Sequence, residues 1–170
     1  MRGLRLFGRQ VLGLGGVIAA FTLAIAVGTK SASTLPTPTP TGMVVKQSPH
    51  SVAETTERFI STAEARGITV MATVDHAQNA SGVDLSLRPT RVVLFGNPRL
   101  GTPLMQCEQS IAIDLPQKML IWEDETGQVS IAYNDPRYLG GRHRLSGCGS
   151  EVIERVAGAL DGLSGSAIAP

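Results

Sequence analysis

Asp75 and His76 are the pair of residues best suited to acid–base chemistry in this chain. Histidine titrates near neutral pH, and a neighbouring carboxylate can fix which ring nitrogen carries the proton. The pair ends an alternating apolar stretch at 68–75, where adjacent side chains point to opposite faces of a strand, so a direct contact needs a bend at His76. A hydrolase or isomerase could use such a pair. In the alternative interpretation, Asp75 caps the following turn and His76 bonds to a loop.

A second candidate site is the glycine-containing loop at 96–102, which joins an expected strand to an expected helix. Free amides at a helix N-terminus bind anions, and Arg99 adds positive charge. No lysine precedes Thr102, so the loop is not a nucleotide P-loop. Alternatively it is a tight turn in which Asn97 bonds the backbone. We predict a pocket for a small anionic ligand between this loop and the Asp75–His76 turn, formed by Asp75, His76, Asn97, Arg99, Gly101 and Thr102.

The sequence predicts no metal site and identifies no cofactor. Its histidines, His50, His76 and His143, have no partner at the i, i+4 spacing of helical metal ligands, and the two cysteines lie far apart. No catalytic serine or cysteine motif is present. The chemistry therefore rests on the two candidate sites above.

The N-terminal residues indicate export. Arg2, Arg5 and Arg9 are followed by an uncharged run from Val11 to Thr29, and the net charge of +1 hides a mildly acidic remainder. Residues 1–30 are therefore predicted to be either a cleaved signal peptide or a retained membrane anchor, with the rest of the chain in the periplasm or another extracytoplasmic space. A mildly acidic domain excludes a nucleic-acid binder.

Export to an oxidising compartment would allow Cys107 and Cys148 to form a disulfide. This bond would close a loop of roughly 40 residues and stabilise the fold by about 4 kcal/mol. The alternative is two reduced thiols.

The candidate residues must be positioned by helices and strands that come after residue 42. Residues 31–42 form a Pro/Thr-rich linker, which cannot build a core. A domain over 43–165 and a tail at 166–170 come next. Within the domain, periodicity and capping signals predict strands and helices. The strands are expected at 43–47, 68–75, 91–96, 118–123 and 128–133, and the helices at 52–66, 102–109, 135–139 and 151–162. This order predicts an α+β fold, an antiparallel sheet of about five strands with helices packed on one face. A ferredoxin-like sandwich is the alternative.

Six short stretches in this domain resemble a known family. They are Val74-Asp75-His76-Ala77, Leu87-Arg88-Pro89-Thr90, Leu94-Phe95-Gly96-Asn97-Pro98, Gly101-Thr102-Pro103-Leu104-Met105, Asp114-Leu115-Pro116 and Ile121-Trp122-Glu123-Asp124. In this order and spacing they resemble the family catalogued as domain of unknown function 302. The resemblance implies a TATA-binding-protein-like fold (strand, helix, four strands, helix) and a homodimer. It implies no reaction.

The sequence thus supports three functional hypotheses. The first is an exported or membrane-anchored domain that binds a small ligand or a protein partner. The second is an enzyme that uses His76 as base and Asp75 to orient it. The third is a structural module that assembles as a homodimer.

Overall fold

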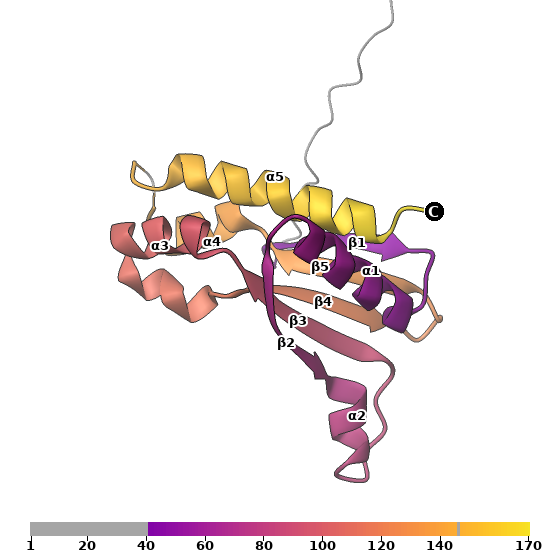
Figure 1. Cartoon of the computed structure of the whole chain (residues 1–170). Coiled ribbons are helices and arrows are strands. Elements are labelled where there is room, and N and C mark those ends of the chain that lie inside the picture. The colour runs from indigo at the N-terminus through magenta and orange to yellow at the C-terminus, as the bar shows by residue number, and fades with distance from the viewer. Residues whose placement is uncertain (1–40, 146) are drawn as a thin grey trace, which may run out of the picture. The chain divides into compact units, whose positions relative to one another are not determined.

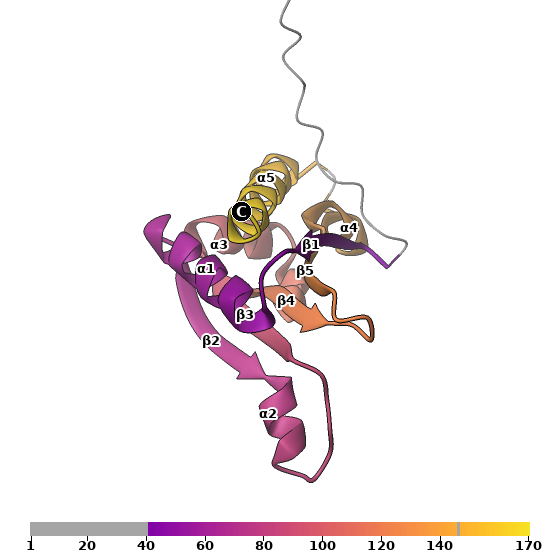
Figure 2. The same ribbon diagram turned by 90° about the vertical axis from the view of Figure 1, so that its right-hand side faces the viewer.

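A computed structural model describes residues 41–145 and 147–170, which form an antiparallel five-stranded sheet covered by helices (Figures 1 and 2). The predicted leader at 1–30 and all but the last two residues of the predicted linker lie outside the described residues. The strands follow the order β1-β5-β4-β3-β2 across the sheet. Their bounds are β1 (Met43–Ser48), β2 (Thr69–Asp75), β3 (Thr90–Gly96), β4 (Gln117–Glu123) and β5 (Val129–Asn134). This arrangement confirms the predicted α+β class.

The helices are α1 (Val52–Ala65), α2 (His76–Ser81), α3 (Pro98–Cys107), α4 (Pro136–Arg142) and α5 (Ser150–Ala167), with a short 3-10 helix η1 (Gln109–Asp114). Ser51 caps α1 as its sequence predicts, because the Ser51 hydroxyl accepts a hydrogen bond of 3.2 Å from the Glu54 amide. Asp135 caps α4 in the same way, 2.9 Å from the Arg137 amide. In the described part of the chain, no helix is long and apolar enough to cross a bilayer.

The main core lies between one face of the sheet and the helices α1 and α5. Alternate residues of β3, β4 and β5 point to this face, and the apolar stripes of the two helices cover them. The Phe59 and Phe95 rings meet edge to face, with centroids 4.9 Å apart. Side chains that are at most 2% exposed in this core include Phe59, Val93, Phe95, Met119, Ile121, Ile131, Leu160 and Leu163.

Two features of the structure correct the sequence interpretation. The expected common face of Ile68, Val70, Ala72 and Val74 is wrong, because β2 contains a bulge. Val70 pairs with Phe95 and Ala72 with Leu94, so the extra residue Met71 switches the strand from one face to the other. The helix expected to begin at Thr102 instead begins at Pro98, after the cap Asn97, and Pro103 lies inside it.

The segment from His76 to Pro89 extends away from the body of the domain (Figures 1 and 2). It consists of α2 and a loop that returns to β3, and none of the residues of α2 is buried. Three apolar side chains of the loop remain exposed, Val83, Leu85 and Leu87. The end of β2 that carries Asp75 and His76 leads into this projecting segment rather than into the body.

Candidate ligand-binding site

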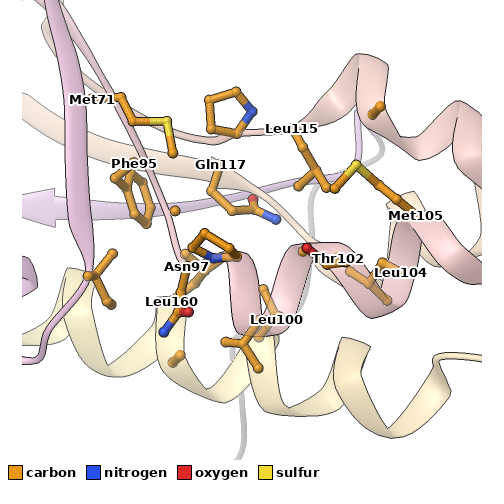
Figure 3. A pocket seen from close by; sticks show the side chains of 18 of the residues that line it. Met71, Phe95, Asn97, Leu100, Thr102, Leu104, Met105, Leu115, Gln117 and Leu160 are labelled. Atoms are coloured by element: carbon orange, nitrogen blue, oxygen red, sulfur yellow. The ribbon is translucent and has the colours of Figure 1, made fainter.

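An apolar cavity of about 330 Å³ lies against α3 (Figure 3). It is at the end of the β2–β3 pair opposite the end that leads into α2. Four parts of the chain enclose it. They are the start of β2 with the paired end of β3, helix α3, the segment from η1 into β4, and the face of α5 that packs on the sheet. The residues that line it are mostly apolar, and among the described residues none that lines it is charged. They include Met71, Phe95, Leu100, Leu104, Met105, Ala112, Leu115, Val156, Ala159, Leu160 and Leu163.

Local sequence explains why α3 forms this wall. The Asn97 side-chain oxygen accepts a hydrogen bond of 2.9 Å from the Arg99 amide, and Pro98 occupies the first helical position, where a missing amide proton costs nothing. Leu100 and Leu104, one turn apart, then face the cavity. Gly101 lies on the same wall, where a Cβ atom would be at ordinary contact distance, 3.6 Å, from the Leu115 side chain.

Three uncharged polar side chains, Asn97, Thr102 and Gln117, lie among the apolar ones (Figure 3). The oxygen of Asn97 is already used by the helix cap. Gln117 pairs through its backbone with Phe95, and its amide group extends from β4 into the lining. A ligand in this cavity would therefore meet mainly carbon, with amide and hydroxyl groups available at a few points.

The structure does not assemble the pocket that the sequence predicted. Asn97, Gly101 and Thr102 line the cavity, whereas Arg99 is exposed and contributes its backbone to the helix cap. Asp75 and His76 lie at the opposite end of the β2–β3 pair, because Thr69 pairs with Gly96 and Asp75 with Arg91. At about 3.4 Å per residue these ends are more than about 15 Å apart, too far for one small ligand to touch both.

Asp75 has the structural role that the sequence left as an alternative. Its carboxylate accepts a hydrogen bond of 3.0 Å from the Gln78 amide, which caps α2, and it pairs with the Arg91 guanidinium at 2.9 Å. The bond from Gln78 and the contact with Arg91 hold the pKa of Asp75 below its usual value. With both partners in place, the carboxylate is occupied and does not orient His76, which is exposed at the first position of α2.

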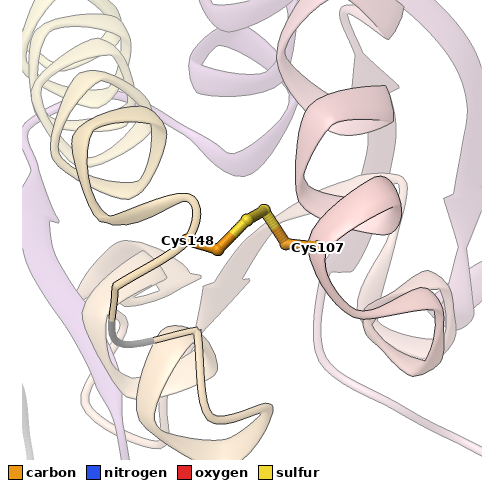
Figure 4. Close-up of a disulfide and its surroundings, with 2 residues drawn as sticks. All are labelled: Cys107 and Cys148. Atoms are coloured by element: carbon orange, nitrogen blue, oxygen red, sulfur yellow. A yellow bond between two sulfur atoms is a disulfide. The ribbon is translucent and has the colours of Figure 1, made fainter.

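A disulfide joins Cys107 to Cys148 beside the cavity, with the Cα atoms 5.8 Å apart (Figure 4). Cys107 is the last residue of α3, and Cys148 lies just before α5 begins. The bond therefore links the two helices that form opposite walls of the cavity. Leu104, Ile111, Leu145 and Ile153 form a small second core next to it.

Sequence reasoning missed the apolar lining because each of its residues looks like ordinary core. The α5 residues Val156, Leu160 and Leu163 repeat at helical spacing, which predicts burial and says nothing of what fills the space beside them. The signal that was available is the short amphipathic helix after β3, with two leucines one turn apart. Among the described residues, no group of three or more His, Cys, Asp or Glu side chains comes together.

The sequence and the fold of this chain are both similar to those of known proteins. A family model described as "Domain of unknown function DUF302" matches residues 44–163. A crystal structure of an uncharacterized conserved DUF302 protein from Bacillus stearothermophilus superposes with a TM-score of 0.61 at 15% identity, over 75% of this chain and 95% of that one. At that identity the likeness shows the fold alone.

Curated relatives include proteins named as fluoride-specific ion channels. FluC 1 of Brucella suis biovar 1 is 46% identical over 111 residues, which are 65% of this chain and 43% of the relative. FluC 1 of Brucella abortus biovar 1 is 46% identical over the same length, 41% of that relative. The chain thus spans less than half the length of these relatives.

Proposed function

The chain belongs to the DUF302 family of domains of unknown function, and from that premise we propose that it binds a small apolar ligand in the cavity between α3 and α5. The observation that carries the proposal is the cavity itself, which is uncharged and lined by leucine, methionine and phenylalanine side chains. Each methylene group that a ligand buries there contributes about 0.8 kcal/mol. A ligand of modest size can therefore reach useful affinity without an ion pair.

The loop at 96–102 suggested an anionic ligand, but the uncharged lining of the cavity favours a neutral one. Burying an anion without a charged partner costs several kcal/mol, and Arg99 does not line the cavity. A neutral molecule with one hydrogen-bonding group suits the site better, because Thr102 or Gln117 can serve that group. The affinity would then come from apolar contact and the orientation from the amide or hydroxyl.

We place this binding activity outside the cytoplasm, on a domain that is either released or held at the membrane. Three observations support the location: the arginines followed by an uncharged run at the N-terminus, the disulfide, and relatives named as fluoride-specific ion channels. A homodimer, expected from the family resemblance, is part of the same proposal. Native mass spectrometry of the protein purified from its own cell envelope tests both. A cytoplasmic, reduced monomer would overturn them.

Filling the cavity tests the binding proposal. Ala159 lines it from α5, and Ala159→Phe places a ring in the space that a ligand would occupy. Binding of the neutral fluorescent probe N-phenyl-1-naphthylamine to the full chain is expected to weaken about tenfold or more, a loss of roughly 1.4 kcal/mol. Fluorescence titration measures it.

The neighbouring position gives a matched control. Gly158 is exposed on the same helix, with no atom within 4 Å of the place where a Cβ would lie, so Gly158→Phe adds the same ring outside the cavity. This variant should bind the probe as the parent does. Equal affinity in all three proteins, or no binding to the parent, would contradict the proposal, provided that circular dichroism shows all three folded.

A further inference from the structure

Ser110, His143 and Asp114 form a continuous hydrogen-bonded chain away from the apolar cavity. The Ser110 hydroxyl lies 3.0 Å from His143 Nδ1, and the other ring nitrogen, Nε2, lies 2.6 Å from Asp114 Oδ2. Serine, imidazole and carboxylate in this order are the components of a nucleophilic triad, which is recognised by geometry rather than by sequence position. Here the hydroxyl meets Nδ1 and the carboxylate meets Nε2.

Two helices and a disulfide hold these side chains together. Ser110 and Asp114 lie near the two ends of η1, and His143 caps the C-terminus of α4 by donating its amide to the Leu139 carbonyl. The Cys107–Cys148 disulfide lies just before η1 and a few residues after His143, so it fixes both segments. The imidazole is only 7% exposed and the Asp114 carboxylate 12%, whereas Ser110 is at the surface. A reagent can thus reach the hydroxyl but not the base behind it.

For a neutral imidazole, the hydrogen bonds determine which ring nitrogen carries the proton. An ionised Asp114 carboxylate can only accept, so Nε2 carries the proton that the two groups share. The neutral imidazole then has its lone pair on Nδ1, where it accepts the proton of the Ser110 hydroxyl. The Arg142 guanidinium also contacts Asp114, at 3.3 Å, through the other carboxylate oxygen, Oδ1.

Other charged groups face the same cluster. The Ser110 amide donates to Glu108 Oε1 at 3.0 Å. The bond from the Ser110 amide holds the pKa of Glu108 below its usual value, with further contributions from the Ser110 side chain, His143 and Arg144. Through the bond to the amide, Glu108 fixes the backbone of the residue that carries the nucleophile.

We propose that Ser110 is a nucleophile, activated by His143 and Asp114, that accepts acyl groups from activated esters. Ser110 Oγ attacks the ester carbonyl carbon while its proton passes to His143 Nδ1. The tetrahedral intermediate expels the alcohol, which takes the proton from Nδ1, and leaves acyl-Ser110. Water then attacks the acyl carbon, gives its proton to Nδ1, and the carboxylic acid departs as Ser110 recovers its proton. Asp114 acts as a positioning residue through its bond to Nε2.

Acylation by p-nitrophenyl acetate tests this assignment independently of ligand binding in the apolar cavity. The full chain is incubated with the ester, release of p-nitrophenol is followed, and peptide mapping by mass spectrometry locates the acetyl group. We expect the acetyl group on Ser110. Ser110→Ala should lose that modification, and Asp114→Asn should acylate about 100-fold more slowly, since general-base assistance contributes about that factor or more.

Ser86 supplies the matched control, because it is an exposed serine in the projecting loop, remote from any imidazole contact. Ser86→Ala should acylate at the parental rate. Peptide mapping of the acetyl group on the parent protein tests the assignment of Ser110 even where a variant fails to fold. Acetylation confined to other residues, unchanged labelling of Ser110 in folded Asp114→Asn, or a parent that shows neither acetylation nor release of p-nitrophenol above that of Ser110→Ala would each overturn the proposal.

Discussion

Replacing both cysteines, as Cys107→Ala with Cys148→Ala, is expected to lower the free energy of unfolding by about 4 kcal/mol. The disulfide spans a sequence separation of 41 residues, and in the chain-entropy model its loss gives the unfolded chain that much additional freedom. The second core beside the cavity, which packs against Cys107, should loosen with it. Urea denaturation followed by circular dichroism measures the change.

The parent protein in a reducing agent is the natural comparison. It should lose nearly the same stability as the double variant, because both lack the same covalent link. A difference of less than about 1 kcal/mol between the oxidised parent and the double variant would show that the bond constrains the unfolded chain little. Two free thiols in the protein isolated without reductant would refute the bond itself.

Truncating Phe59 is expected to cost about 3–5 kcal/mol, the usual range for a fully buried aromatic residue. Phe59 is 0% exposed on α1, and its ring packs edge to face against Phe95. Phe59→Ala would remove this contact and leave a void between α1 and the sheet. Because Phe95 also lines the apolar cavity, the same change should weaken binding of the neutral probe. Denaturant unfolding and probe titration are the two measurements.

Phe59→Leu separates volume from aromatic contact. It keeps most of the apolar volume, so it should recover much of the stability that Phe59→Ala loses. An unfolding free energy within about 1 kcal/mol of the parent for Phe59→Ala would contradict the packing, since a buried ring cannot be removed so cheaply.

The fold was accessible to sequence reasoning where local signals agree. Ser51 and Glu54 mark the start of α1, and Asp135-Pro136 marks α4, because capping chemistry acts over a few residues. The start of α3 was predicted at the wrong place, because Asn97-Pro98 and Thr102-Pro103 are both cap-then-proline signals, five residues apart, and the helix begins at the first. The bulge at Met71 has no local signature, as its cause is the pairing of β2 with β3.

The candidate site was harder to foresee because it depends on contacts between distant segments. Alternation indicated that Asp75 ends a strand, but only the register with β3 shows that Arg91 occupies its carboxylate. Likewise, the sequence spacing of Asp114 and His143 does not predict that the end of α4 brings them into contact. Sequence periodicity locates buried faces, whereas a cavity is the volume that several such faces fail to fill.

The position of β1 also affects the order in which the domain can fold. β1 lies at an edge of the sheet, and its only strand neighbour in the described structure is β5, with Val44 opposite Tyr133. As the chain emerges from the ribosome or a translocation channel, its first strand has no neighbour to pair with until nearly the whole domain has followed. Such long-range closure is slow. The strand that begins the domain is therefore among the last to find its partner, whichever channel the chain leaves.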